Sequence, residues 1–363
     1  MPPNEAPTDK LRILTFDGGG IRGLIPALVL AELESRLVAR AGDDARICDY
    51  FHLFAGTSTG GLIALGLTVP DPGRPGRPLV DAAELAGLYV EDGPRIFHRT
   101  LWQRLRTLWG LIGPKYTLGP LEDAVVARLG TGRLAEALRE VIVASYDMTD
   151  RSPYFFKRWR AREDAARNSP VVDAALATAA APTYFPPREL DGHALVDGGV
   201  FAANPVIAAI TETLKRTESP GRLETEDLMV VSIGTGLHEE GFRAEEIRGW
   251  GRLGWILPKR GEPPILGAVL DGASDGADHW AHMLLNHAPG SGAPEASEIG
   301  RGPRYFRLQV PLDDAIGLDD ASEDALQRRL PEAAAALIAS RDSELEAITE
   351  RLIAAGPLPQ DRP

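Results

Sequence analysis

The chain has 363 residues, is 44% hydrophobic and carries a formal net charge of −13 at neutral pH. That length allows a buried core in one large domain or in two modest ones. The acidic balance argues against nucleic acid as a partner, because a polyanion is repelled on average. Cys48 is the single cysteine, which excludes an internal disulfide framework and a multi-cysteine zinc site.

The N-terminal residues 1–10 are polar and proline-rich, so we expect a disordered tail. They contain no apolar stretch of the kind that a secretory signal needs. No run of the sequence approaches the ~18 apolar residues of a membrane-spanning helix. We therefore expect a cytoplasmic protein, and its oligomeric state stays open.

The first elements alternate between strand and helix patterns. Residues 11–16 and 50–55 are predicted strands, and residues 24–38 and 60–67 are predicted helices. This order is typical of a parallel sheet with helices on both faces.

The same alternation continues to the end of the chain. Further strands are predicted at residues 140–146, 154–159, 193–196, 228–233 and 305–310, and further helices at 82–90, 171–181, 206–216 and 322–354. We find no internal repeat and no convincing linker. Residues 237–300 are rich in Gly and Pro and weakly periodic, so we interpret them as an insertion. The predicted organisation is one catalytic domain at 11–312 and a helical segment at 313–363.

Two glycine-rich turns each lie between a predicted strand and a predicted helix. Gly56-Thr-Ser58-Thr-Gly60 has the Gly-x-Ser-x-Gly spacing of a nucleophile elbow, in which a sharp turn exposes a serine hydroxyl. Asp17-Gly-Gly-Gly-Ile-Arg-Gly23 offers backbone N–H groups at a helix start, where a developing negative charge is stabilised. A nucleophile and an anion cradle together indicate acyl transfer.

A serine nucleophile needs a base, and the histidines are poorly placed to supply one. The candidates that follow Ser58 are His193, His238, His279, His282 and His287. None lies in a tight loop after a strand. His279 and His282 are three residues apart on a predicted helix, but no carboxylate pattern typical of a metal site accompanies them.

Asp197 is the better candidate for the base. It ends a predicted strand and is followed by two glycines, so its carboxylate can lie at the edge of the sheet. The reference pKa of aspartate is about 2.6 units below that of histidine, which corresponds to roughly 3.5 kcal/mol of lost driving force. Desolvation raises a carboxyl pKa and recovers part of this loss. A Ser/Asp dyad therefore requires a dry pocket.

Taken in order, Asp17-Gly-Gly-Gly-x-Arg-Gly, Gly-x-Ser58-x-Gly and Asp197-Gly-Gly resemble the three-part signature of the patatin-like phospholipases. Further matching segments are residues 180–187, Asn204-Pro205 and residues 232–236. The resemblance runs from about Leu11 to the strand at Tyr305.

This resemblance implies an α/β fold, a three-layer α/β/α sandwich with a mostly parallel central sheet. It also implies a lipid acyl hydrolase of the phospholipase A or lysophospholipase type that uses no metal and no other cofactor. Ser58 would be the nucleophile and Asp197 the base. The oxyanion hole would be formed by Gly18, Gly19 and Gly20, with Arg22 holding that loop or the phosphate.

One stretch has the composition of an interfacial amphipathic helix or lid. Residues 93–121 contain no acidic residue, and Trp102 and Trp109 recur there at helical spacing. The basic residues of the stretch are Arg95, Arg99, Arg104, Arg106 and Lys115. We expect it to contact a phospholipid surface; the alternative is a helix whose aromatic face packs on the core.

Two other functions stay open. Gly18-x-Gly20-x-x-Gly23 also satisfies the dinucleotide fingerprint, with Asp43 or Asp44 roughly 20 residues further on. That reading leaves Ser58 and Asp197 unexplained. By its resemblance to bacterial patatin-like effectors of anti-phage defence, the chain is alternatively a phospholipase switched on by a cyclic nucleotide, with residues 242–300 as the regulatory segment.

Overall fold

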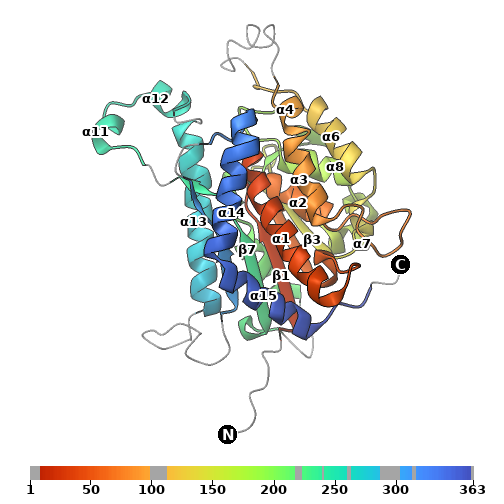
Figure 1. The fold of residues 1–363 in the computed structure, drawn as a ribbon. Helices are drawn as coiled ribbons and strands as arrows, with labels where there is room; N and C mark the ends of the chain where they lie inside the picture. Colours follow the sequence, from red (N-terminus) through yellow and green to blue (C-terminus); the bar gives the residue numbers. More distant parts are fainter. Residues whose placement is uncertain are drawn as a thin grey trace.

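A central sheet with helices on both faces organises the computed structural model of this protein (Figure 1). The structure describes residues 9–98, 113–216, 223–238, 241–259, 263–286, 303–312 and 316–360. The strands of the main sheet are β1 Leu11–Phe16, β2 Leu53–Thr57, β3 Glu140–Asp147, β4 Ser152–Lys157, β5 Arg188–Leu190, β6 His193–Asp197, β7 Leu228–Ile233 and β9 Tyr305–Leu308. The short strands β8 Leu237–His238 and β10 Pro311–Leu312 pair separately.

The strand order is β5-β6-β3-β2-β1-β7-β9, with β4 paired to β3. The strands β3, β2, β1, β7 and β9 run parallel to one another, and β4, β5 and β6 add antiparallel pairs at one side. The predicted three-layer α/β/α sandwich with a mostly parallel central sheet is thereby confirmed.

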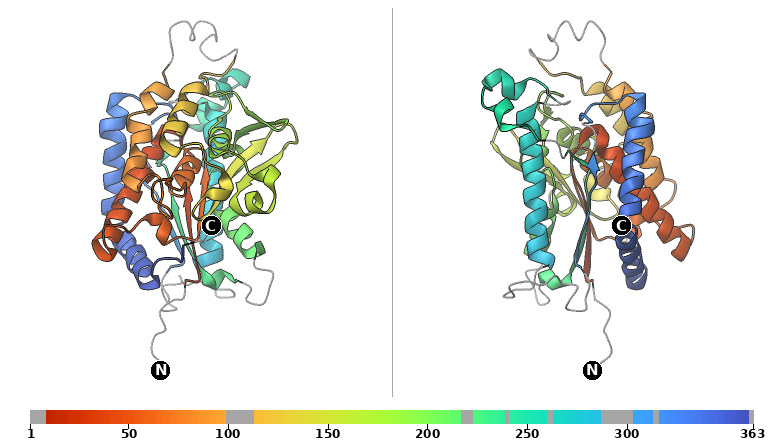
Figure 2. Two further views of the ribbon diagram at one scale, coloured as in Figure 1. Left: turned by 90° about the vertical axis from the view of Figure 1, so that its right-hand side faces the viewer. Right: turned by 60° about the vertical axis from the view of Figure 1, so that its left-hand side comes forward.

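The described helices are α1 Leu24–Ala41, α2 Thr59–Gly66, α3 Ala82–Val90, α4 Gly93–Ile96, α6 Gly119–Leu129, α7 Arg158–Glu163, α8 Val171–Thr178, α9 Gly199–Ala202, α10 Val206–Arg216, α11 Ala244–Ile247, α12 Arg252–Ile256, α13 Pro264–Asn286, α14 Leu330–Ser340 and α15 Asp342–Ala355. Figure 2 shows the sheet between two helical layers, with α13 on one side and α1 and α14 on the other.

Side-chain alternation along the strands builds a core on each face of the sheet. In β1, Leu14 and Phe16 join the cluster under α1, α2 and α14, whereas Ile13 joins the cluster under α10 and α13. All three side chains are fully buried. Because both faces are covered, the central strands β1, β2 and β7 are buried along almost their whole length, as is typical of parallel sheets.

Three elements differ clearly from the sequence prediction. The single helix predicted at 322–354 is divided at Arg341 into α14 and α15. The strand predicted at 50–55 occupies Leu53–Thr57, because residues 47–49 form a tight turn that ends at Tyr50. Residues 264–286, within the weakly periodic stretch, form the 23-residue helix α13. Glycine, alanine and aspartate dilute its apolar pattern, yet Gly267, Ser274 and Ala277 are buried.

The described residues contain no helix that combines the length and the apolar character needed to cross a bilayer. The boundary between a catalytic domain at 11–312 and a helical segment at 313–363 stays a prediction, as does the disordered tail at 1–10.

Candidate active site

The two glycine-rich turns and Asp197 meet around one cavity at the carboxyl ends of β1 and β2. This is where open α/β sheets bind their ligands. The cavity is lined by Gly18, Gly19, Gly20, Ser58 and Asp197 among others. Segments that are far apart in the sequence therefore form one site, as their order along the chain had predicted.

Ser58 has the backbone of a nucleophile elbow. It follows β2 directly and precedes α2, and its φ of 55° and ψ of −126° are unfavourable for any residue with a side chain. The glycines make the turn possible, because a β-carbon at Gly56 would lie 2.0 Å from the Gly60 carbonyl oxygen. A β-carbon at Gly60 would lie 2.3 Å from the Phe16 carbonyl oxygen. The strained backbone of Ser58 is thus kept in place by close backbone packing at Gly56, before it, and at Gly60, after it.

Thr178, at the end of α8, connects the backbone of the nucleophile elbow to β3 through two hydrogen bonds. Its Oγ1 accepts a hydrogen bond from the Ser58 N–H over 2.8 Å and donates to the Ala144 carbonyl of β3 over 2.5 Å. The residue is fully buried. Sequence reasoning missed it, since an alanine-rich helix gave no sign that its single threonine contacts the nucleophile turn.

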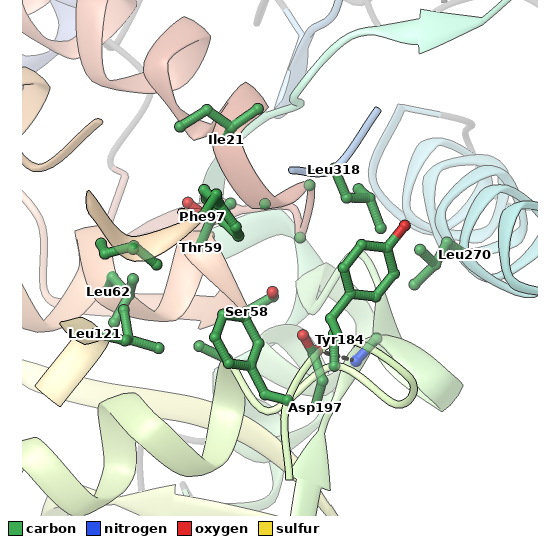
Figure 3. A pocket seen from close by; sticks show the side chains of 18 of the residues that line it. Ile21, Ser58, Thr59, Leu62, Phe97, Leu121, Tyr184, Asp197, Leu270 and Leu318 are labelled. Carbon is green, nitrogen blue, oxygen red and sulfur yellow. Dashed lines mark hydrogen bonds between the residues drawn. The ribbon is translucent and has the colours of Figure 1, made fainter. Parts of the chain in front are cut away.

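The Asp197 carboxyl is buried and faces the Ser58 hydroxyl (Figure 3). It accepts a hydrogen bond from the Gly199 N–H over 2.7 Å. Burial raises the pKa of Asp197 to about 7, although the Ser58 hydroxyl and the Gly199 N–H both act to lower it. That value is close to the reference pKa of histidine. The dry pocket that a Ser/Asp dyad needs is present.

The backbone of the Gly18–Gly20 turn is only partly free to bind an anion. The Gly18 N–H donates to the Ala203 carbonyl over 2.8 Å, and the Ile21 N–H donates to the Leu318 carbonyl over 2.8 Å. In the described part of the chain, the N–H groups of Gly19 and Gly20 have no such acceptor. These two N–H groups are therefore available as hydrogen-bond donors beside Ser58.

Close contacts also explain the glycines of this turn. Gly20 has a φ of +57°, and a β-carbon there would lie 2.1 Å from the Leu318 carbonyl oxygen. Gly19 is extended, so its requirement is steric: a β-carbon would lie 2.2 Å from Thr235 Oγ1. The Thr235 hydroxyl in turn donates to the Gly18 carbonyl over 2.9 Å.

Arg22 is buried and holds the loop. Its Nη1 lies 2.7 Å from His238 Nε2, and its Nε approaches the Gly19 carbonyl oxygen at 3.5 Å. It is not among the residues that line the cavity. Of the two roles expected for Arg22, this arrangement favours holding the loop over contacting a phosphate.

A buried ion pair anchors the start of the same loop. Arg307 of β9 contacts both carboxylate oxygens of Asp17, at 2.9 Å from Nη1 and 2.6 Å from Nη2. Ser274 of α13 donates to the same carboxylate over 2.9 Å. No motif in the sequence pointed to Arg307 or Ser274, because they follow Asp17 by more than 250 residues.

The remaining cavity wall is almost entirely apolar. It includes Leu62, Leu88, Ile96, Phe97, Leu121, Tyr184, Phe185, Leu266, Leu270 and Leu318. Several of these surround Ser58 in Figure 3. Such a wall suits a hydrocarbon chain attached to a carbonyl at Ser58.

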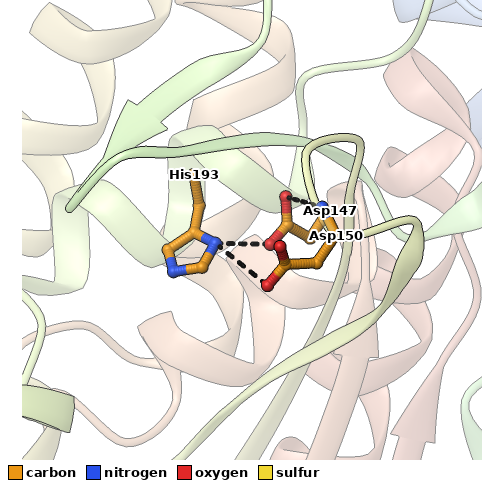
Figure 4. Close-up of side chains that lie close together, drawn as sticks. All are labelled: Asp147, Asp150 and His193. Carbon is orange, nitrogen blue, oxygen red and sulfur yellow. Dashed lines mark hydrogen bonds and ion pairs between the residues drawn. The ribbon is translucent and has the colours of Figure 1, made fainter.

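The described histidines lie elsewhere, and none lines the cavity. The Nδ1 atom of His193 lies 2.5 Å from a carboxylate oxygen of Asp147 and 3.8 Å from one of Asp150 (Figure 4). These three side chains form the single group of potential metal ligands among the described residues, but the Asp147 carboxylate also accepts the Thr149 N–H, as in a tight turn. His279 is exposed, and His282 contacts Asn286.

Two predictions fall outside the described residues. His287 is one of them. The other is the predicted lipid contact of residues 93–121, because its Trp102 and Trp109 lie within residues 99–112, which the structure does not describe. That contact stays a prediction.

Comparisons with known proteins show which family this chain resembles. The patatin-like phospholipase family model matches residues 14–210. Patatin-like protein 2 of Arabidopsis thaliana is 38% identical, covering 89% of this chain and 81% of that protein. Patatin group J-1 of Solanum tuberosum is 34% identical, covering 69% and 67%. Among solved structures, VipD from Legionella pneumophila covers 91% of this chain and 67% of its own at 11% identity, with a TM-score of 0.36.

The assignment rests on the family model and the plant relatives. These matches give no support to the dinucleotide-binding alternative, which stays an untested prediction. The family match spans both glycine-rich turns and Asp197. The chain belongs to the patatin-like phospholipase family and is a lipid acyl hydrolase.

Proposed function

We propose that Ser58 and Asp197 form a catalytic dyad that hydrolyses carboxylic esters of membrane phospholipids through an acyl-enzyme. One observation carries the proposal: a buried carboxyl with a pKa of about 7 faces a serine in an elbow turn. No cation in the described part of the chain pairs with Asp197. A carboxylate in this state accepts a proton near neutral pH.

In the first half-reaction, Ser58 Oγ attacks the ester carbonyl and its proton passes to Asp197. The oxyanion that forms is stabilised by the N–H groups of Gly19 and Gly20. The tetrahedral intermediate then collapses, and the carbon–oxygen bond to the glycerol oxygen breaks. Asp197 returns the proton to that oxygen, so the lysolipid leaves as an alcohol.

In the second half-reaction, a water molecule attacks the acyl group on Ser58. Asp197 takes one proton of the water and then returns it to Ser58 Oγ as the fatty acid leaves. The apolar wall holds the acyl chain during both steps. It also limits water around Asp197, which preserves the raised pKa that the base requires.

A cyclic nucleotide activator stays a prediction that rests on the resemblance alone. If the chain is an antiviral effector of that kind, the purified protein is nearly silent on phospholipids until the nucleotide is added. Measuring hydrolysis with and without cyclic nucleotides separates this case from a constitutive hydrolase.

The proposed reaction is tested by incubating the protein with mixed phospholipids and following free fatty acid and lysolipid by mass spectrometry. Wild type is expected to release both in equal amounts, and Ser58→Ala neither. A suitable control is Ser340→Ala on α14, which lies on the outer helical layer away from the cavity. Release of a phosphorylated headgroup instead would contradict ester hydrolysis at the acyl position.

A further inference from the structure

A small helical unit projects from the end of the molecule where the catalytic strands terminate (Figure 1). It contains α11 and α12 and is stiffened by three rings: Phe242 packs on Trp250 at 4.8 Å, and Trp250 on Trp255 at 5.4 Å. These ring contacts hold the unit together, although Trp255 is itself 36% exposed. The aliphatic side chains of the unit are also exposed, Leu253 at 66% and Ile256 at 51%.

The same apolar surface continues onto the first turns of α13. Ile265 and Val269 are exposed there, at 46% and 38%. Their helix neighbours Leu266 and Leu270 line the cavity beside Asp197. One helix therefore carries acyl-site residues on one side and solvent-exposed aliphatic residues on the adjacent side. An exposed apolar surface of this kind marks an interaction site.

Charge in this region differs from that of the rest of the chain. Residues 243–259 contain four basic residues, Arg243, Arg248, Arg252 and Lys259, against two acidic ones, Glu245 and Glu246 of α11, whereas the whole chain has a net charge of −13. The basic residues Arg248, Arg252 and Lys259 lie on the part of the unit that carries Leu253 and Ile256. Arg248 and Arg252 are exposed, and the Lys259 ammonium lies 5.2 Å from the ring centre of Trp250. Basic residues around exposed Trp, Leu and Ile side chains are typical of surfaces that bind anionic lipid.

We propose that Leu253, Ile256, Leu257, Ile265 and Val269, which we call the docking surface, insert into the phospholipid bilayer that holds the substrate. The inference rests on the proposed phospholipid hydrolysis and adds the surface that brings the enzyme to the membrane. Arg248 and Arg252 contact lipid phosphates while the aliphatic side chains enter the headgroup region. An acyl chain then passes from the bilayer along α13 to Ser58 without crossing bulk water.

The opposite end of α13 provides a matched control. Trp280, Met283 and Leu284 are also exposed, at 60%, 47% and 47%. They lie three to four helical turns from Val269, do not line the cavity, and the charged residues just before them, Asp275 and Asp278, are acidic. The docking proposal therefore predicts that these side chains do not contact lipid.

The experiment compares two double variants of the full chain. The first carries Leu253→Ser and Ile256→Ser in the docking surface, and the second, as the control, carries Trp280→Ser and Leu284→Ser. Sedimentation is measured with phosphatidylcholine vesicles, with and without phosphatidylglycerol. Hydrolysis is measured on the same vesicles and on a short-chain soluble ester. The first double variant should bind vesicles at least about tenfold more weakly and lose vesicle hydrolysis to the same extent. Its turnover of the soluble ester, and all properties of the second variant, should match wild type.

Charge is tested separately with Arg248→Glu and Arg252→Glu together. This variant should lose the extra affinity that phosphatidylglycerol confers, and should bind pure phosphatidylcholine as wild type does.

Several results would overturn the docking surface while leaving the catalytic proposal intact. One is undiminished vesicle binding by the Leu253/Ile256 variant; another is an equal loss in the Trp280/Leu284 variant. A third is a loss confined to Trp102→Ala with Trp109→Ala, which would place the contact on the earlier basic stretch. If wild type is a dimer and the Leu253/Ile256 variant a monomer, the surface binds a second copy. If wild type did not hydrolyse the soluble ester at all, that result would instead contradict the proposed function.

Discussion

Asp17 and Asp197 occupy equivalent positions in the fold but differ in their surroundings. Asp17 directly follows β1 and Asp197 is the last residue of β6; each is followed by at least two glycines, and each carboxyl is buried. Asp17 is paired with Arg307 through two hydrogen bonds and with Ser274 through a third. Asp197 has the Gly199 N–H and the Ser58 hydroxyl, and no cation in the described part of the chain.

This difference separates an anchor from a base. Burial raises the pKa of both carboxyls, but Arg307 opposes the rise at Asp17, and Asp17 in turn raises the pKa of Arg307. The pair is therefore an internal salt bridge that holds the Gly18–Gly20 loop in place. At Asp197 the Ser58 hydroxyl and the Gly199 N–H oppose the rise in pKa, but no cation in the described part of the chain does, so burial dominates. The sequence Asp-Gly-Gly thus has two different surroundings, and a distant arginine makes the difference between an anchor and the proposed base.

The largest expected effect is on turnover in Asp197→Asn. The amide cannot accept the serine proton, so kcat on a soluble ester should fall on the order of 10⁴-fold or more. Circular dichroism should show the native fold. Retention of more than a few per cent of wild-type turnover would mean that another group is the base.

A smaller loss of turnover is expected for Gly19→Ala. The added methyl group would lie 2.2 Å from Thr235 Oγ1, so the loop must move and its N–H groups lose their aim at the oxyanion. Losing one such donor lowers kcat by about 10²–10³ in other acyl hydrolases. The control is Gly119→Ala, since a β-carbon at Gly119 has no atom within 4 Å; it should keep full activity. Equal kinetics for the two variants would refute the role of the loop.

Asp17→Asn should act mainly on stability. It leaves the buried Arg307 charge with the longer contact to Asp278, 3.8 Å from its Nε; removing one partner of a buried ion pair typically costs about 3–5 kcal/mol. Urea denaturation should show this loss in the free energy of unfolding. The double variant Asp17→Asn with Arg307→Met removes the buried charge and should recover part of it. An Asp17→Asn protein as stable as wild type would remove the distinction between anchor and base.

Asp197→Asn should have the opposite effect on stability, and the effect should depend on pH. The folded-state pKa of about 7 lies above the ordinary value of 3.8, so wild type loses stability as pH rises between these values. The asparagine variant has no such group. It should be more stable than wild type by up to roughly 4 kcal/mol above about pH 8, and the gain should vanish near pH 4. Thermal unfolding at several pH values checks this.

The smallest effects are expected for the histidines. Replacing His193, His238, His279, His282 or His287 one at a time should lower kcat by less than about tenfold, with His238 the largest because it contacts Arg22. Chelators should not change the rate. If one histidine variant were as inactive as Ser58→Ala, the catalytic group would be a Ser/Asp/His triad and not a Ser/Asp dyad.

The turns around the site were predictable because their signals are local. A strand pattern, a glycine-rich turn and a helix pattern follow one another around Ser58 and again around Gly18–Gly20. The end of β2 was harder to predict from the sequence, because a strand that is buried on both faces has no alternation of polar and apolar residues to mark its limits. Its two-residue shift brings Thr57 into the strand and Ser58 directly onto the turn.

The supporting residues were not predictable, for a physical reason. Thr178, Ser274 and Arg307 reach the site through tertiary packing from elements that are 120 to 290 residues away from their partners. Nothing in their own neighbourhood sets them apart from other buried polar residues. The pKa of Asp197 likewise depends on a cavity that closes only when α8, α9 and α13 come together.

The central claim is that Asp197, unlike Asp17, is an unpaired base for Ser58. The most direct measurement is the rate at which a fluorophosphonate probe labels the protein as a function of pH, with the adduct located by mass spectrometry. We predict an adduct on Ser58, a rate that rises with pH through an apparent pKa of about 7, and almost no labelling of Asp197→Asn. An adduct on another serine, or labelling of Asp197→Asn as fast as wild type, would contradict the account.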